Sequence, residues 1–203
     1  RSENPAPPHY NPSMTDSTAI DLSNQFLIAM PNMADPNFAG VVIYVCEHTP
    51  EGALGLVINR PTDLTLAGLL ERIELDIDDV DTEGHTEPVF YGGPVQTDRG
   101  FVLHAPTGKY MSTVEVGELA LTTSRDVLQA VAEGGGPPRL LVTLGYSGWG
   151  AGQLEEELSD NAWLTVTASP DIIFNTPPEQ RFNAALKLLG IDPIMLAGEA
   201  GHA

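Results

Sequence analysis

Two apolar runs joined by a short turn restrict the fold of this chain more than any other feature. The runs are VVIYVCEH, residues 41–48, and ALGLVINR, residues 53–60, and the turn between them is TPEG, residues 49–52. Proline second and glycine fourth are typical of a type I turn, so the runs are predicted to form a β-hairpin. The first run is apolar at consecutive positions, which indicates a strand covered on both faces. We therefore expect it near the centre of a sheet.

Further strands are predicted along the rest of the chain. They are expected at QFLIAM (25–30), on both sides of the Gly92-Gly93-Pro94 corner, in LALTT, in the run that leads into LGYSGWG, and at AWLTV (162–166) and DIIFN (171–175). Most of these segments are separated by short turns rather than by helices. This spacing favours antiparallel neighbours in one sheet.

Four segments are predicted to be helical. They are residues 65–73, capped by Thr65; a segment opened by Thr122 or Thr123 and stopped at glycines 134–136; residues 152–158; and residues 177–190, with a capping box at Thr176 and Glu179 and a stop at Gly190. Because strands outnumber helices and adjoin one another, the pattern favours an α+β fold with a mixed sheet over a regular α/β fold.

The length suits one domain with a tail. The chain has 203 residues, of which 42% are hydrophobic, and this is enough for a substantial core. Residues 1–21 are polar, contain four prolines and lack the apolar stretch of a secretory signal, so they are predicted to be a disordered tail. Met14 is a candidate natural start. Residues 22–203 are predicted to form a single domain.

The charge balance excludes some partners. Nine lysines and arginines stand against 28 aspartates and glutamates, for a formal net charge of −19. Such a surface repels phosphate backbones and anionic lipids, and the basic residues form no run. We therefore expect no membrane partner. A direct nucleic-acid-binding regulator stays open as a disfavoured alternative.

Cysteine content and hydropathy indicate a cytoplasmic location. The chain has one cysteine, Cys46, so it has no internal disulfide and fits a reducing compartment. The longest apolar run, residues 41–46, is far shorter than the roughly 20 residues that span a bilayer. No transmembrane helix is predicted.

Ser147 lies between glycines after a predicted strand and is a candidate nucleophile. A nucleophile elbow requires G-x-S-x-G, but Trp149 occupies the last position here. The single histidine that follows Ser147 in the chain is His202, near the C-terminus, and His104 precedes it. A structural turn is therefore favoured. A hydrolase that uses Ser147 or Cys46 is kept as an alternative.

Two segments that could be ligand-binding loops lack the residue spacing that such loops require. GWGAGQ lacks the lysine of a P-loop and the glycine spacing of a dinucleotide loop, and acidic residues follow it in the predicted helix. The acidic segment LDIDDVDTEGHTEP, residues 75–88, lacks the spacing of a Ca²⁺ loop. It is predicted to be a solvated loop.

The segment CEH, residues 46–48, is the densest group of potential metal ligands. On a regular strand Cys46 and His48 share one face and Glu47 takes the other, so the three do not converge without a bulge. A Cys-His-His zinc site that includes His104 is the alternative to a buried, inert cysteine. No metal or cofactor is predicted.

The motifs taken together resemble those of the AlgH-like family, UPF0301, of small bacterial proteins. The motifs are FLIAMPNMADPNFAGVVIYVCEH, EGALGLVINRP, FYGGPV, RGFVLHAP, TTSRDVL, LGYSGWGAGQLEEEL, NAWLTV and the closing GHA, and they extend from about residue 22 to residue 203. The resemblance implies an α+β fold with a curved, partly open or bifurcated mixed sheet and peripheral helices. It implies neither an enzymatic activity nor a cofactor.

The resemblance also selects two groups of residues. Those that a sharply curved sheet requires are Gly92, Gly93, Pro94, Gly145, Tyr146, Gly148, Trp149, Gly152 and Trp163. The polar motif residues that are predicted to line one recognition surface are Glu47, His48, Asn59, Arg60, Gln153 and Glu155. We therefore expect a non-catalytic intracellular protein that acts through a protein or small-molecule partner, with a role in regulation. The partner and the oligomeric state stay open.

Overall fold

The structure is a computed structural model that describes residues 20–77 and 85–199. Most of the predicted tail, residues 1–21, and the centre of the acidic loop lie outside these residues. The strands are β1 (Gln25–Ala29), β2 (Val42–Thr49), β3 (Gly52–Val57), β4 (Pro61–Thr65), β5 (Pro88–Tyr91), β6 (Val95–Ala105), β7 (Thr113–Val116), β8 (Leu119–Thr122), β9 (Arg139–Gly150) and β10 (Trp163–Thr167). The helices are the 3₁₀ turn η1 (Pro36–Phe38), α1 (Leu66–Arg72), α2 (Asp126–Ala132), α3 (Gln153–Ser159), α4 (Pro170–Phe174), α5 (Pro178–Leu188) and α6 (Pro193–Glu199).

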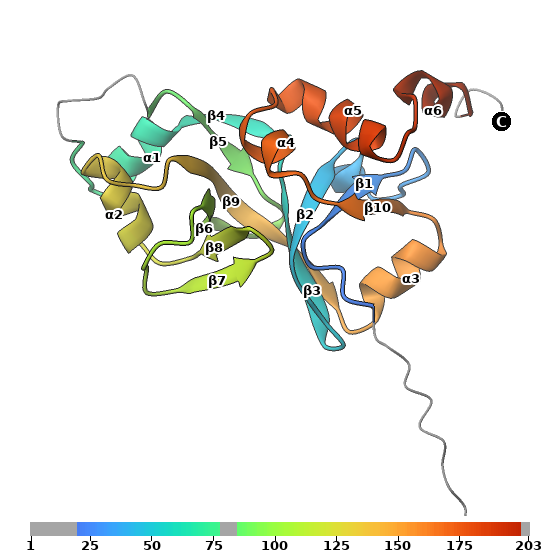
Figure 1. Ribbon diagram of the computed structural model, residues 1–203, viewed down its shortest axis with the longest axis horizontal. Coiled ribbons are helices and arrows are strands. Elements are labelled where there is room, and N and C mark those ends of the chain that lie inside the picture. The colour runs from blue at the N-terminus through green and yellow to red at the C-terminus, as the bar shows by residue number, and fades with distance from the viewer. Residues whose placement is uncertain (1–19, 78–84, 200–203) are drawn as a thin grey trace, which may run out of the picture.

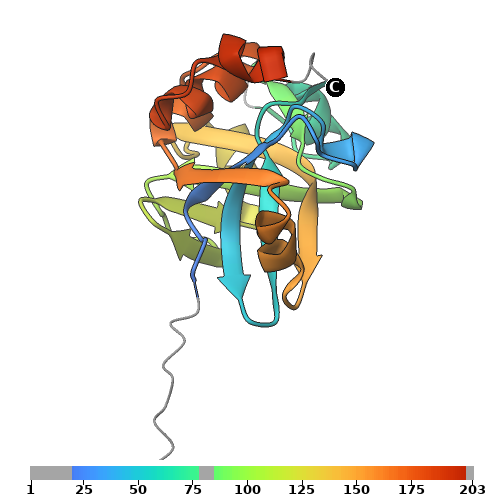
Figure 2. The same ribbon diagram turned by 90° about the vertical axis from the view of Figure 1, so that its right-hand side faces the viewer.

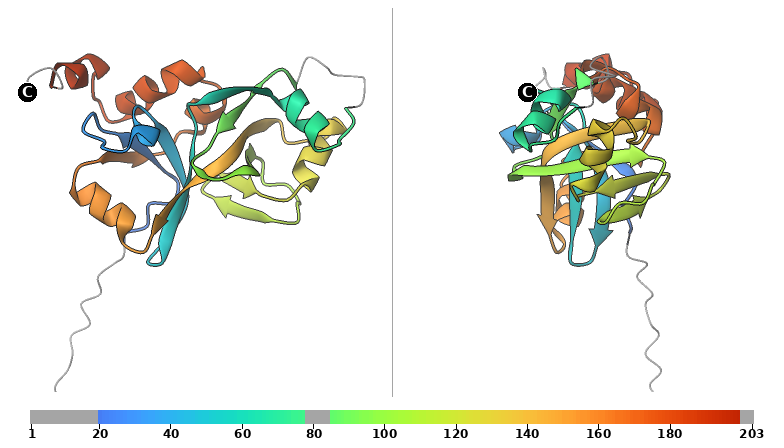
Figure 3. Two further views of the ribbon diagram at one scale, coloured as in Figure 1. Left: turned by 180° about the vertical axis from the view of Figure 1, so that it is seen from behind. Right: turned by 90° about the vertical axis from the view of Figure 1, so that its left-hand side faces the viewer.

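The strands form one curled mixed sheet that divides into two halves. Its main path runs β10-β1-β2-β3-β9-β6-β8-β7, and β5 joins β9 as a parallel strand and β4 as an antiparallel one. Figures 1 and 3 show β9 bridging the half that contains β1, β2, β3 and β10 and the half that contains β6, β7 and β8. The α+β class and the curved, bifurcated mixed sheet are confirmed. The predicted hairpin is β2–β3, and β2 lies inside the sheet between β1 and β3.

The corner after β5 crosses β9 in close backbone contact. The Gly92 N–H donates to the Leu144 carbonyl at 2.9 Å, and the Gly92 carbonyl accepts from Val57 N–H at 2.9 Å. A Cβ atom on Gly93 would lie 2.1 Å from the carbonyl carbon of Tyr146. Side chains at this corner would therefore force the two halves of the sheet apart.

Three buried apolar clusters lie between the sheet and its helices. The first, around Tyr44 and Phe26, is covered by α4 and α5, and the second, around Trp149 and Trp163, by α3. The third, around Leu70, is covered by α1 and α2. Figure 2 shows α3 beside the β2–β3 hairpin and α5 across the opposite end of the sheet. In the part of the chain that the structure describes, no helix is long and apolar enough to span a bilayer.

The strand predicted over DIIFN is wrong. Residues 171–174 belong to α4, which begins at Pro170 and buries Ile172 and Ile173. Proline fixes the backbone angle that the first helical position needs. Packing of the two isoleucines against the first cluster then outweighs their preference for strands.

Several predicted boundaries also differ from the structure. Thr65 caps α1 as expected, with Oγ1 accepting from the Gly68 N–H at 3.1 Å. Thr122 does not open a helix, because it ends β8 and its helix starts at Asp126. Thr176 forms no capping box, because its hydroxyl donates to a carbonyl of α4 instead. The sharp corner expected around Ser147 is also absent, because β9 continues to Gly150.

Candidate functional site

A bulge in β2 separates the three residues of the CEH motif. The pairing with β3 shifts by one residue between Val45 and Glu47, so that Cys46 is the extra residue. Cys46 points into the first apolar cluster, whereas His48 points toward α3 on the other side of the sheet. Their expected common face is therefore wrong. Among the described residues, no three His, Cys, Asp or Glu side chains are placed to hold a metal ion.

His48 joins the hairpin to two other segments. Its side chain is 3% exposed, its Nδ1 accepts from the Leu22 N–H at 3.0 Å, and its Nε2 lies in hydrogen-bonding contact with the Glu155 carboxylate. Because a backbone N–H donates to Nδ1, the ring proton is on Nε2 and is donated to Glu155. The pKa of Glu155 is lowered, first by a hydrogen bond from its own backbone N–H and then by His48. This pair fixes α3 against β2.

Gln153 stabilises the turn that precedes α3, the helix that His48 contacts. Its Oε1 accepts from the Gly150 N–H at 3.0 Å, across the turn that connects β9 to α3. Gly152 in that turn has φ +73°, a left-handed conformation that favours glycine. Gln153 and His48 therefore act on adjacent parts of one junction between β2, β9 and α3.

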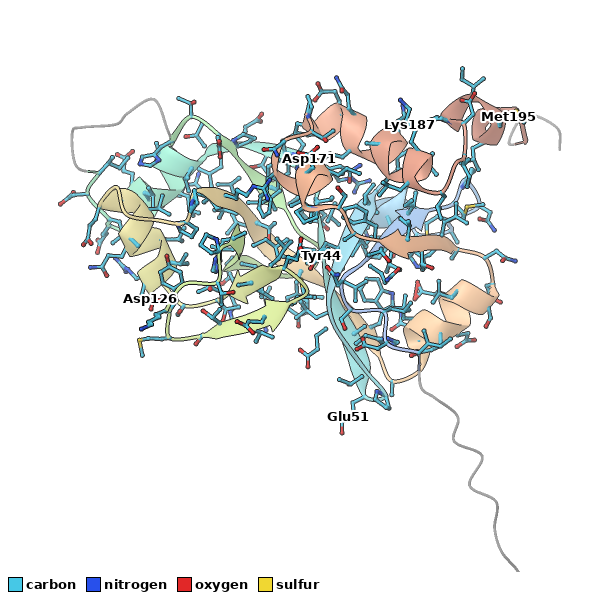
Figure 4. The ribbon with its side chains drawn as sticks, in the orientation of Figure 1. Tyr44, Glu51, Asp126, Asp171, Lys187 and Met195 are labelled. Atoms are coloured by element: carbon cyan, nitrogen blue, oxygen red, sulfur yellow. The ribbon has the colours of Figure 1, made fainter. Side chains whose placement is uncertain are left out.

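An open hollow lies beside this junction, at the tip of the hairpin. It has a volume of about 450 Å³ and is lined by Glu47, Thr49, Glu51, Gly52, Ala53, Leu54, Val95, Tyr146, Gly148 and Trp149. The Tyr146 ring packs edge-on against Phe101 at 5.4 Å, which holds this aromatic wall in place. The exposed Glu47 and Glu51 make the rim acidic, and Figure 4 shows Glu51 projecting from the hairpin tip. The hollow suits a cationic group with an apolar portion.

Asn59 and Arg60 lie at the opposite end of the hairpin. The Asn59 side chain accepts from Val42 N–H at 2.9 Å and donates to the Gly40 carbonyl at 3.0 Å. The Arg60 guanidinium donates to the carbonyls of residues 37 and 39. Both side chains hold the segment between β1 and β2 in place. The structure thus places His48, Gln153 and Glu155 at one junction, whereas Glu47 lines the hollow and Asn59 and Arg60 lie at the other end of the hairpin.

The two candidate nucleophiles are buried. Ser147 has no exposed surface, and its hydroxyl donates to the Gly92 carbonyl at 3.2 Å. Cys46 is 4% exposed, and burial raises the pKa of its thiol. A hydroxyl that donates to a backbone carbonyl and a thiol held in its protonated form are both poor nucleophiles. The geometry gives the hydrolase alternative no support.

His104 belongs to a buried polar network in the other half of the molecule. Its Nδ1 donates to the Pro106 carbonyl at 3.0 Å, and its Nε2 accepts from the Thr122 hydroxyl at 2.7 Å. Burial lowers its pKa, and the hydrogen bond to Pro106 offsets part of this effect. The ring is therefore neutral and structural, and it shares no site with Cys46 or His48.

The stability of the protein is expected to fall when His104 is protonated. Because the folded-state pKa lies below that of the unfolded chain, about 6.5, unfolding takes up a proton between these two values. The free energy of unfolding should therefore decrease as pH falls below about 6.5 toward the folded-state pKa. Urea unfolding at pH 7.5 and 5.0 measures this decrease. His104→Gln should show a smaller decrease than the wild type, and an equal decrease would contradict the assignment.

Arg181 is a buried functional candidate that the sequence did not reveal. It is 5% exposed and lies on α5, and it lines a second cavity with Arg139. The available signal was its position four residues before the buried Ala185, on the apolar stripe of the helix. A charged residue on such a stripe needs a specific partner.

The fold and the junction define a class: an α+β domain on a curled, divided sheet, with an acidic hollow at the tip of its central hairpin. The chain belongs to the AlgH-like family, because the model of that family matches residues 26–194. The family expected from the sequence motifs is thus confirmed.

Named relatives and solved structures agree with this assignment. UPF0301 proteins of Bordetella petrii and Bordetella avium are 69% and 68% identical, covering 93% and 94% of this chain and 92% and 96% of theirs. The solution structure of the Pseudomonas aeruginosa AlgH protein is similar with TM-score 0.75 and 55% identity, over 94% of this chain and 100% of that one. A Corynebacterium diphtheriae protein, at 16% identity and TM-score 0.67, covers 88% of this chain and 91% of its own and shares the fold.

Proposed function

We propose that this AlgH-like chain is a non-catalytic cytoplasmic protein that binds a basic segment of a partner protein in the hairpin-tip hollow. One observation carries the proposal: the polar side chains beside the hollow are engaged in structural hydrogen bonds, while Glu47 and Glu51 remain exposed on its rim. The rim therefore offers charge and an aromatic wall without a catalytic group.

The charge of the chain supports a cationic partner. A net charge of −19 attracts basic segments over distances comparable to the screening length and accelerates their association. Tyr146 and Leu54 provide apolar contact for the stems of lysine or arginine side chains. Binding of this kind regulates a partner by occupying its basic segment, and no reaction is required.

Neutralising the rim is expected to weaken the binding of a basic peptide. A fluorescent lysine-rich hexapeptide serves as the probe, and its polarisation is measured at low and high salt. The double variant Glu47→Gln, Glu51→Gln should lower the affinity by about two- to thirtyfold, because each exposed ion pair contributes about 0.2–1 kcal/mol. The difference should shrink in high salt.

A charge-matched control distinguishes binding at the hollow from attraction of the peptide by the overall negative charge of the protein. The double variant Glu118→Gln, Glu133→Gln removes the same charge at exposed positions outside the hollow. It should change the affinity by less than about twofold. Equal losses in the two double variants would reject the hollow as the binding site. Labelling of native Ser147 by a fluorophosphonate would instead support the hydrolase alternative.

A further inference from the structure

Arg181 is a buried arginine that forms no ion pair with the carboxylates that the structure describes. Its side chain packs against Phe90 of the first apolar cluster, and the residue is 5% exposed. Within residues 20–77 and 85–199, no carboxylate oxygen lies within 4.0 Å of the Arg181 guanidinium. Burial lowers its pKa to about 10. A buried charge without a counter-ion is unfavourable unless a ligand supplies one.

The guanidinium of Arg181 is only partly engaged. Its Nε donates to the Thr176 carbonyl at 2.8 Å, and its Nη1 donates to the Ile58 carbonyl. The group packs over the Phe90 ring at 4.9 Å. A guanidinium has five N–H donors, and the described residues provide no acceptor for those on Nη2. The residue is thus fixed in place with donors still available.

Arg181 lines a cavity of about 440 Å³. The cavity lies where the start of β9 meets β5, α4 and the beginning of α5, which are adjacent in Figure 1. Arg139, the first residue of β9, lines it as a second cation and packs over Phe174 at 5.8 Å. Most of the other lining residues have apolar side chains, among them Leu141 and Ile173, and the wall also presents polar groups such as the Asn175 amide.

The surroundings restrict the charge of a ligand. Glu87 also lines the cavity, and both Glu87 and Glu179 act electrostatically on Arg181. With a net charge of −19, the molecule disfavours anions that carry several charges. One negative charge and an apolar body fit two guanidinium groups and an apolar wall.

We propose that this cavity binds a small monocarboxylate with an apolar body. The carboxylate accepts hydrogen bonds from Nη2 of Arg181 and from Arg139, and the body lies against Phe174 and the apolar wall. The site is separate from the hairpin-tip hollow and does not rest on the function proposed for it.

Benzoate is a suitable probe for the full chain. Isothermal titration at low salt should give saturable binding with a dissociation constant of about 1 mM, because a small ligand held by two charge-assisted contacts binds weakly. Benzamide, which has the same shape without the charge, and inorganic phosphate, which has charge without an apolar body, should each bind at least about tenfold more weakly. Equal binding of benzamide, or of phosphate, would overturn the proposal.

Variants test which residues hold the carboxylate. Arg181→Lys keeps the charge but loses the planar fork, and should weaken benzoate binding about tenfold. Arg139→Gln changes an exposed residue and should weaken it about threefold with the fold intact by circular dichroism. Lys187→Gln removes the same charge on α5, where Figure 4 shows Lys187 away from α4, and should have no effect beyond about twofold.

Glu87→Gln is expected to change the benzoate affinity in the opposite direction from the arginine variants. Removing this carboxylate should strengthen benzoate binding by about two- to threefold, because a like charge beside the ligand is lost. A purely structural Arg181 would not produce this gain. Absence of saturable benzoate binding, or benzoate binding that is unchanged in both Arg139→Gln and Arg181→Lys, would reject the site.

Discussion

Alanine at position 93 is expected to leave the chain unable to reach its native fold under conditions in which the wild type folds. The added Cβ would lie 2.1 Å from the carbonyl carbon of Tyr146 and 2.3 Å from the nitrogen of Ser147. Both contacts are backbone atoms of β9, so no side chain can rotate to relieve them. Gly93 also has φ +156°, which other residues rarely adopt. The free energy of unfolding should fall by more than about 4 kcal/mol.

Gly100→Ala is the matched control in the following strand. Nothing lies within 4 Å of a Cβ at Gly100, and its φ is outside the left-handed range. Its stability should stay within about 0.5 kcal/mol of the wild type. Urea unfolding followed by circular dichroism measures both variants. If Gly93→Ala unfolds at the same urea concentration as Gly100→Ala, the two halves of the sheet are not tied at this corner.

Local patterns predicted the parts of the fold that depend on local chemistry. The hairpin followed from a consecutive apolar run and a turn with proline and glycine at suitable positions, and α1 followed from leucine spacing behind Thr65. The helix over Ile172 and Ile173 could not be predicted in this way. Its two isoleucines prefer strands, and packing against α5 decides the outcome.

The candidate site was predicted only in part, because the directions of the Cys46 and His48 side chains depend on a bulge in β2. A regular β2 would place Cys46 and His48 on one face, but the bulge at Cys46 reverses the residues that follow. His48 can therefore reach Glu155, which is 107 positions away in the chain. Arg181 was missed for a related reason. Its free donors and the cavity beside it arise from packing between distant segments.

Trp149→Ala is expected to be among the most destabilising side-chain truncations in this domain. Trp149 is 6% exposed in the second apolar cluster, where it stacks on Phe38 at 6.4 Å and meets the edge of Trp163 at 6.2 Å. Its removal leaves a cavity between β9 and α3 that the backbone cannot close. The free energy of unfolding should fall by about 3–5 kcal/mol. Denaturant unfolding followed by circular dichroism measures the loss.

Trp149→Phe distinguishes the loss of side-chain packing from an effect that any substitution at this position in β9 would have. Phenylalanine can keep the stacked contact with Phe38 and fill part of the volume, so the loss should be roughly 1–2 kcal/mol. Trp163 is then the one tryptophan left, and its fluorescence reports on the same cluster. Equal losses for alanine and phenylalanine would mean that the indole does not pack as the structure shows. A smaller loss for phenylalanine than for alanine would indicate that Trp149 fixes α3 against the sheet. The position of α3 in turn holds Glu155 within reach of His48.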